Sequence, residues 1–175
     1  MKIGTVFGLA AAAICMLALE DENSRRAQAA DTRGGFDTLS MEARAILDQS
    51  EKLVLVSIEP TPLNREAKTK QTGSFHNHAV LGQTEIRDAK RKAELLSALY
   101  GGVYEYQGRL YGCFDPRHGI IAVAGTNRVE LVICFECQRV EEFVNSNESR
   151  CLIHDSAREI FNRTLTEAGV PLAKK

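Results

Sequence analysis

The feature that most constrains the fold is an alternating segment, RVELVICFECQRVEEFV, at residues 128–144. Its apolar residues recur at every second position, which is typical of a β-strand with one buried face, because strand side chains point alternately to the two faces. Two further runs precede it, RLYGCF at residues 109–114 and GIIAVAG at residues 119–125, and the second ends in a glycine. We therefore predict a long antiparallel hairpin that turns near residues 125–127.

The remaining segments predict a mixed fold. Residues 52–60 and 75–86 have the aliphatic and β-branched density of strands. Amphipathic stretches that follow Ser40, Asp88 and Ser156 predict three helices. The predicted order is α-β-β-α-β-β-α. Its simplest realisation is an α+β fold with a mostly antiparallel four-stranded sheet and helices packed on one face.

Composition limits the classes of partner. A chain of 175 residues has room for one domain with a substantial core. The formal net charge of −1 argues against a general electrostatic attraction to nucleic acid. Aromatic residues make up only 6% and tryptophan is absent, which also argues against a base-stacking surface. We expect no nucleic-acid partner.

The N-terminus has the pattern of an export signal. An apolar run at residues 3–19 follows Met1-Lys2, and Ala27-Gln28-Ala29 provides a cleavage site of the A-x-A type. We predict a signal peptide at 1–29, a flexible lead-in at 30–38 and a single α+β domain at 39–175. The location is then periplasmic or extracellular, with no stable membrane span after cleavage. The alternative is a membrane-anchored form, although the apolar run is marginal in length for a span.

The cysteines gather around the predicted hairpin. Cleavage would remove Cys15 and leave Cys113, Cys134, Cys137 and Cys151. Cys134 and Cys137 form a C-x-x-C pair, but in a regular strand residues three apart point to opposite faces. A zinc knuckle or a thioredoxin-type site is therefore disfavoured unless the strand is interrupted by a bulge.

Hairpin pairing brings the other residues of this region closer. A turn at 125–127 pairs residue i with about 252 − i, within two residues, so Cys113 falls near Cys137. The segment Pro116–His118 falls near Cys134 by the same rule. A shift of one residue in register decides which side chains share a face.

Four interpretations of the cysteines remain open. Export favours a disulfide, most simply Cys113–Cys137. Buried free thiols without chemistry are also common. A transition metal such as zinc has candidate ligands in Cys113, His118, Cys134 and Cys137. A catalytic thiol has candidates in Cys134 or Cys113, with His118 as base and Arg117 holding an anionic substrate.

Arg117 and His118 also have structural interpretations. Arg117 can form an ion pair with Glu136 across the hairpin. His118 can be a hydrogen-bonded imidazole in the turn DPRHG, at residues 115–119, and we favour this over a ligand role. If this region is a ligand-binding surface, the candidate binding residues are Arg117, His118, Cys134 and Glu136.

The segments CFDPRHGI (113–120) and ICFEC (133–137) resemble an uncharacterised family of small bacterial proteins, often with export signals. In that family CF-x-PRHGI and D-x-x-ICFEC segments recur, and Glu130 stands at the acidic position of the second. The resemblance covers Lys52 to Leu172. It implies a bacterial source and a unit centred on the hairpin, without an activity. The matching positions are Cys113, Pro116, Arg117, His118, Cys134, Glu136 and Cys137.

These observations lead to one principal hypothesis. We expect a small exported binding protein whose Cys/His/Arg site on the 110–140 hairpin holds a metal or a small ligand, with a disulfide as a stabilising element. The motivation is the concentration of these residues in a region without a complete catalytic signature. The alternatives are a thiol-dependent enzyme and a purely structural, disulfide-stabilised domain. The ligand or protein partner is not identified by the sequence.

Overall fold

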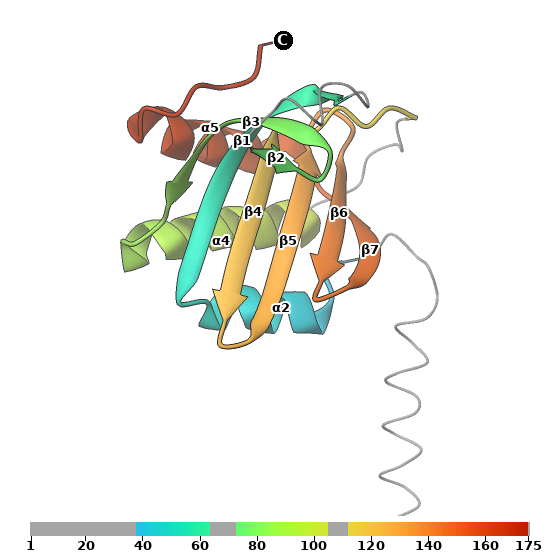
Figure 1. Cartoon of the computed structure of the whole chain (residues 1–175). Helices are drawn as coiled ribbons and strands as arrows, with labels where there is room; N and C mark the ends of the chain where they lie inside the picture. Colours follow the sequence, from blue (N-terminus) through green and yellow to red (C-terminus); the bar gives the residue numbers. More distant parts are fainter. Residues whose placement is uncertain (1–37, 64–72, 105–111, 175) are drawn as a thin grey trace, which may run out of the picture. The chain divides into compact units, whose positions relative to one another are not determined.

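The computed structural model describes residues 38–63, 73–104 and 112–174, all within the compact unit Phe36–Lys175 (Figure 1). The predicted signal peptide, residues 1–29, and nearly all of the predicted lead-in lie outside the described residues. Among the helices of the described part, none has both the length and the apolar character needed to cross a membrane.

The described residues form three α-helices, one short 3-10 helix and seven strands. In chain order these are α2 (Met41–Gln49), β1 (Lys52–Pro62), β2 (Ser74–Phe75), β3 (His78–Glu85), α4 (Ala89–Tyr104), β4 (His118–Ala124), β5 (Asn127–Cys134), β6 (Arg139–Val144), β7 (Asn147–Leu152), η1 (Asp155–Ala157) and α5 (Arg158–Glu167).

The strands form one curled antiparallel sheet, a half-barrel with the order β2-β3-β1-β4-β5-β6-β7 (Figure 1). The turn of the predicted hairpin is confirmed, with strands β4 and β5 joined at Gly125-Thr126. The arms of the hairpin are shorter than predicted, because the described part of the run at 109–114 and the residues up to 117 are not strand, and β5 ends at Cys134. The hairpin pairs Gly119 with Val132, one residue from the predicted register. Gly125 has a φ of 58°, a conformation that glycine adopts without steric cost.

The predicted four-stranded sheet, with helices packed on one face and the order α-β-β-α-β-β-α, is wrong. The sheet has seven strands, and the observed order is α-β-β-β-α-β-β-β-β-α apart from η1. The segment 128–144 is two strands rather than one, because the chain turns at residues 135–138. A second tight turn at Asn145-Ser146 leads into β7, a strand that the sequence pattern does not predict.

The curl of the sheet is visible in the contact between Phe75 and Gly119. Phe75 lies in β2, three strands from Gly119 in β4, which is about 14 Å across a flat sheet at the usual strand spacing. Yet a Cβ atom placed on Gly119 would lie only 2.4 Å from Cε1 of Phe75. Register irregularities between β1 and β3 accompany this bend, as bulges do in twisted sheets.

The apolar residues form two clusters. The larger contains residues of all three helices and alternate residues of the central strands, including Leu55, Ile120 and Ile133. The smaller lies on the other side of the same strands and includes Val56, Phe75 and Val132. Side chains on the two faces of β5 therefore enter different environments, and this separation positions the site described next.

Candidate functional site

The C-x-x-C pair lies in a turn, not inside a strand. Cys134 is the last residue of β5, and residues 135–138 form the turn into β6. The turn is closed by a hydrogen bond from the Gln138 amide to the Phe135 carbonyl at 3.3 Å, and Gln138 has a φ of 52°. The Cys137 amide donates to the Sγ atom of Cys134 at 3.0 Å. The prediction that the strand continues through the pair is therefore wrong.

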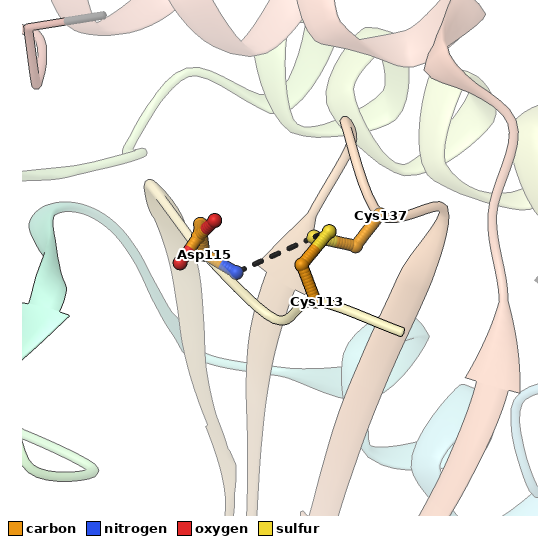
Figure 2. Close-up of side chains that lie close together, drawn as sticks. All are labelled: Cys113, Asp115 and Cys137. Atoms are coloured by element: carbon orange, nitrogen blue, oxygen red, sulfur yellow. Dashed lines mark hydrogen bonds between the residues drawn. The ribbon is translucent and has the colours of Figure 1, made fainter. Parts of the chain in front are cut away.

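Three cysteine sulfurs meet at this turn, and Figure 2 shows those of Cys113 and Cys137 beside each other. Cys134 and Cys137 form a disulfide, with their Cα atoms 5.2 Å apart. The Sγ atom of Cys113 lies 3.2 Å from the Sγ atom of Cys137. The predicted proximity of Cys113 and Cys137 is thus confirmed, while the bonded partner of Cys137 in the structure is Cys134.

The three sulfurs differ in their access to solvent. Cys134 and Cys137 are each 1% exposed, whereas Cys113 is exposed and carries a free thiol. Cys113 belongs to the segment that leads into β4, and this segment crosses the turn closely enough for the Asp115 amide to donate to the Sγ atom of Cys137 at 3.3 Å. The cluster is therefore buried on one side and open at Cys113.

Asp115 adds an oxygen donor to the cluster (Figure 2). One carboxylate oxygen of Asp115 and the sulfurs of Cys113 and Cys137 lie within 4.8 Å of one another. Asp115 is not among the ligands predicted from the sequence, because Asp-Pro is common turn chemistry. Its spacing of two residues from Cys113 was the available signal.

His118 lies on the opposite side of the sheet from the disulfide. It pairs with Ile133 in the neighbouring strand, and directly paired residues share a face of the sheet. Cys134 follows Ile133 in β5, so its side chain points to the opposite face. The imidazole is 5% exposed and packs edge-on against Phe135 and Phe161 of the larger core cluster. The structure does not bring it to the sulfurs.

The hydrogen bond of His118 reaches a helix instead. Its Nε2–H group donates to Oδ1 of Asn162 in α5 at 2.8 Å. Burial lowers the pKa of His118 from 6.5 to about 4, so the ring is neutral at physiological pH. The structural interpretation of His118 as a hydrogen-bonded imidazole is confirmed. Asn162 has no sequence signal, since its place opposite His118 depends on how α5 packs.

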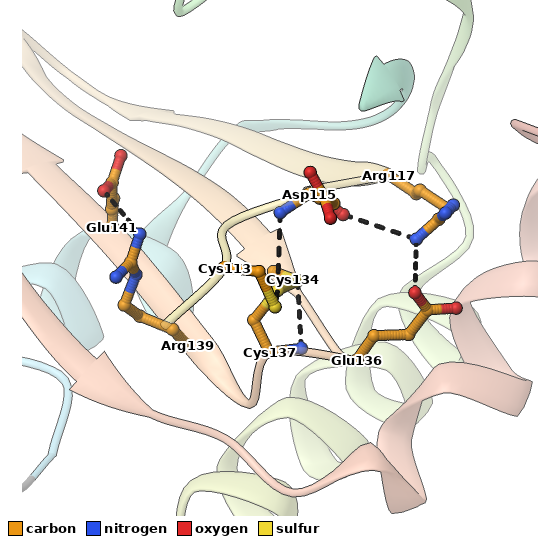
Figure 3. The surroundings of a disulfide bond; sticks show 8 residues. All are labelled: Cys113, Asp115, Arg117, Cys134, Glu136, Cys137, Arg139 and Glu141. Carbon is orange, nitrogen blue, oxygen red and sulfur yellow. Dashed lines mark hydrogen bonds and ion pairs between the residues drawn. A yellow bond between two sulfur atoms is a disulfide. The ribbon is translucent and has the colours of Figure 1, made fainter. Parts of the chain in front are cut away.

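Two arginines flank the sulfur cluster (Figure 3). Arg117 donates to Glu136 at 2.9 Å, as predicted for an ion pair across the hairpin. Arg139, which pairs directly with Cys134 in the sheet, places its guanidinium 4.1 Å from the centroid of the Phe114 ring. The Nε atoms of both arginines are buried with no hydrogen-bond partner among the described residues. Arg139 also forms an ion pair with Glu141 at 3.6 Å, so each guanidinium beside the sulfurs is balanced by a glutamate.

Glu130, the acidic residue ahead of ICFEC, takes part in a separate cluster. Its carboxylate lies 2.6 Å from Nε2 of His76 and also accepts from Arg128. The hydrogen bond from His76 is the main reason why the pKa of Glu130 is lowered. The His76 ring stacks on Phe143 at 3.9 Å. These contacts pin the β2–β3 hairpin to the sheet and do not involve the cysteines.

Cys151, the fourth cysteine of the predicted domain, is 0% exposed and belongs to the larger core cluster. Burial raises the pKa of its thiol to about 12. It is thus an unreactive core residue.

No protein-family model, curated protein or solved structure matches this chain.

Proposed function

We propose that the protein binds a thiophilic transition-metal ion, with zinc as the simplest occupant, through the thiolates of Cys113, Cys134 and Cys137. The observation that carries this proposal is the convergence of three sulfurs from two separate segments at one turn. Thiolates are the ligands that zinc and copper(I) prefer, and a C-x-x-C turn joined by a distant third cysteine is a common way to supply them.

The sulfur geometry is close to that of a tetrahedral thiolate site. With zinc–sulfur bonds of about 2.3 Å, tetrahedral sulfurs are about 3.8 Å apart. The sulfurs of Cys113 and Cys137 are 3.2 Å apart. Reduction of the Cys134–Cys137 disulfide releases the third sulfur into the same volume. The Asp115 carboxylate supplies the oxygen donor that completes four ligands.

The backbone supports sulfur in its anionic form. The amides of Cys137 and Asp115 donate to the sulfurs of Cys134 and Cys137, respectively. Such donors stabilise a thiolate more than a neutral thiol, because they oppose its negative charge. This environment supports a metal or another electrophilic ligand at the sulfurs.

Binding is favoured over thiol catalysis because the proposed base is misplaced. In the alternative enzyme, His118 would take the proton of Cys134 or Cys113. His118 instead lies on the other face of the sheet and is hydrogen-bonded to Asn162. The same separation removes His118 from the proposed ligand set. Export of the chain, and its resemblance to the bacterial family with the same two motifs, remain predictions.

Metal titration of the reduced chain tests the proposal. The purified protein is reduced with a phosphine under anaerobic conditions, and zinc is titrated in competition with a chromophoric chelator. We expect one equivalent to bind and Cys113→Ser to weaken the affinity. Cys151→Ala is the matched control, because that thiol is buried away from the turn. Binding of less than stoichiometric zinc to the reduced wild-type chain would overturn the proposal.

A further inference from the structure

We propose that Cys113 is the exchange cysteine through which small-molecule thiols reduce the buried Cys134–Cys137 disulfide. This activity goes beyond metal binding and does not depend on it. Cys134 and Cys137 are each 1% exposed, so a solvent thiol has almost no access to either sulfur of the bond. Cys113 is exposed and its sulfur lies 3.2 Å from that of Cys137.

The first step is an internal exchange. The deprotonated sulfur of Cys113 attacks the Sγ atom of Cys137, the bond between Cys137 and Cys134 breaks, and Cys134 leaves as a thiolate. No oxidant or reductant is consumed, because one disulfide replaces another. The proton lost by Cys113 is matched by the proton that Cys134 takes up. The Cys137 amide, which donates to the Cys134 sulfur, stabilises this leaving thiolate.

The internal exchange moves the disulfide to the surface. The new bond joins Cys137 to Cys113, whose sulfur solvent can reach. A small-molecule thiol then attacks Cys113, which forms a mixed disulfide and releases Cys137 as a thiolate. A second thiol molecule attacks the sulfur of the first. The products are one small-molecule disulfide and the reduced protein, so two thiols lose the two electrons that the protein disulfide gains.

The neighbouring residues favour this thiol–disulfide exchange. Asp115 and Cys113 belong to one short segment. The Asp115 amide donates to the Sγ atom of Cys137 at 3.3 Å, which keeps this sulfur beside that of Cys113. The Arg117–Glu136 ion pair links this segment to the turn. The attacking and attacked sulfurs are thus kept together by contacts other than their own. Cys151 is excluded from the exchange, since it lies in the larger core cluster.

Reduction kinetics in the presence of a metal chelator test the proposal separately from metal binding. The oxidised full chain is mixed with reduced glutathione, quenched with acid at intervals, alkylated and analysed by mass spectrometry. We expect Cys113→Ser to slow reduction of the Cys134–Cys137 bond by about tenfold or more, because the direct route is buried. Cys151→Ala, the matched control, should keep the wild-type rate. Equal rates in wild type and Cys113→Ser would overturn the proposal.

A second variant traps the exchanged state. In Cys134→Ser, mild oxidation is expected to produce a Cys113–Cys137 disulfide, which peptide mapping without reduction identifies. Glutathione should reduce this bond faster than the wild-type bond, because Cys113 is exposed. Failure to form it in a folded Cys134→Ser protein would also overturn the proposal. All of these experiments are free of metal, so their failure would leave the zinc titration unaffected.

Discussion

The sulfur of Cys113, an exposed residue ahead of β4, lies 3.2 Å from the sulfur of Cys137, a buried residue in the turn between β5 and β6. These two residues are separated by 24 positions in the chain, whereas Cys137 and Cys134 are separated by 3. One sulfur atom therefore has both a local and a distant partner.

The contribution of the disulfide to the free energy of unfolding depends on which two cysteines it joins. In the chain-entropy model, a bridge across 3 positions contributes about 2 kcal/mol to the free energy of unfolding. A bridge across 24 positions contributes about 3 to 4 kcal/mol. We expect reduction of the metal-free wild-type protein to lower the free energy of unfolding by about 2 kcal/mol, measured by urea denaturation. A loss near the larger value would indicate that Cys113–Cys137 is the resting disulfide.

Acid should destabilise the fold through His118. Burial lowers the pKa of this imidazole from 6.5 in the unfolded chain to about 4 in the folded protein. Between these values the unfolded chain binds a proton that the folded protein does not, so stability falls as the pH falls from 6.5 to 4. The contribution of the neutral His118 ring to the free energy of unfolding is fully present above this range. Its loss on acidification amounts to about 3 kcal/mol at most.

The variant His118→Gln removes this titration while keeping a side chain that can hydrogen-bond to Asn162. We expect the free energy of unfolding, measured by denaturant at several pH values, to lose most of its dependence between pH 6.5 and 4. His154→Asn is the control, because His154 caps the Ser156 amide and Asn can replace that cap. An unchanged pH slope in His118→Gln would refute the assignment.

The curl of the sheet should depend on the absence of a side chain at Gly119. Alanine there would place Cβ at 2.4 Å from the Phe75 ring, so Gly119→Ala should lower stability by about 1 to 3 kcal/mol. Gly101→Ala in α4 is the control. Nothing lies within 4 Å of its Cβ position, and alanine favours a helix, so stability should rise by up to about 1 kcal/mol.

A double-mutant cycle with Phe75→Leu identifies the ring as the cause. The smaller side chain leaves room near residue 119, so the cost of Gly119→Ala should shrink in that background. Thermal or urea unfolding of the four proteins measures the coupling. Strictly additive effects would mean that the curl does not bring Phe75 over Gly119.

Glu142 should anchor the start of α2 to the sheet. This carboxylate is 2% exposed and accepts hydrogen bonds from the Ser40 amide at 3.0 Å and the Ser149 hydroxyl at 3.1 Å. Glu142→Ala leaves both donors without an acceptor, and we expect a loss of about 2 to 3 kcal/mol in the free energy of unfolding. Glu148→Ala on exposed β7 is the control and should change stability by less than about 0.5 kcal/mol. Similar costs for the two variants would contradict this role.

The hairpin was predictable because its signals were local. Alternation of apolar residues and the glycine at position 125 place the turn and the register of β4 with β5. The segments that continue these two strands contain Cys113 and Cys137, whose sulfurs meet beyond the last paired residues. The pairing of Arg117 with Glu136 follows from the same register. The part of the site that depends on neighbouring strands could thus be inferred from the sequence.

The turn at residues 135–138 was not predictable in the same way. It contains neither glycine nor proline, and Gln138 adopts a positive φ that is unusual for that residue. Phe135 and Cys137 are both buried, so the apolar period continues through the turn as if the strand did. Sulfur contacts and long-range packing hold this turn. Strand β7 was missed for the opposite reason, since its first four residues are exposed and show no alternation.

If Cys113, Cys134 and Cys137 act as one ligand set, cobalt(II) titration of the fully reduced chain should show all three sulfurs on the metal. Cobalt in a tetrahedral thiolate site gives sulfur-to-metal charge-transfer absorption whose intensity grows with the number of coordinated sulfurs. We predict saturation at one equivalent, with the band reduced by about a third in Cys113→Ser and unchanged in Cys151→Ala. No charge-transfer band in the reduced wild-type protein, or an equal band in Cys113→Ser, would contradict the account.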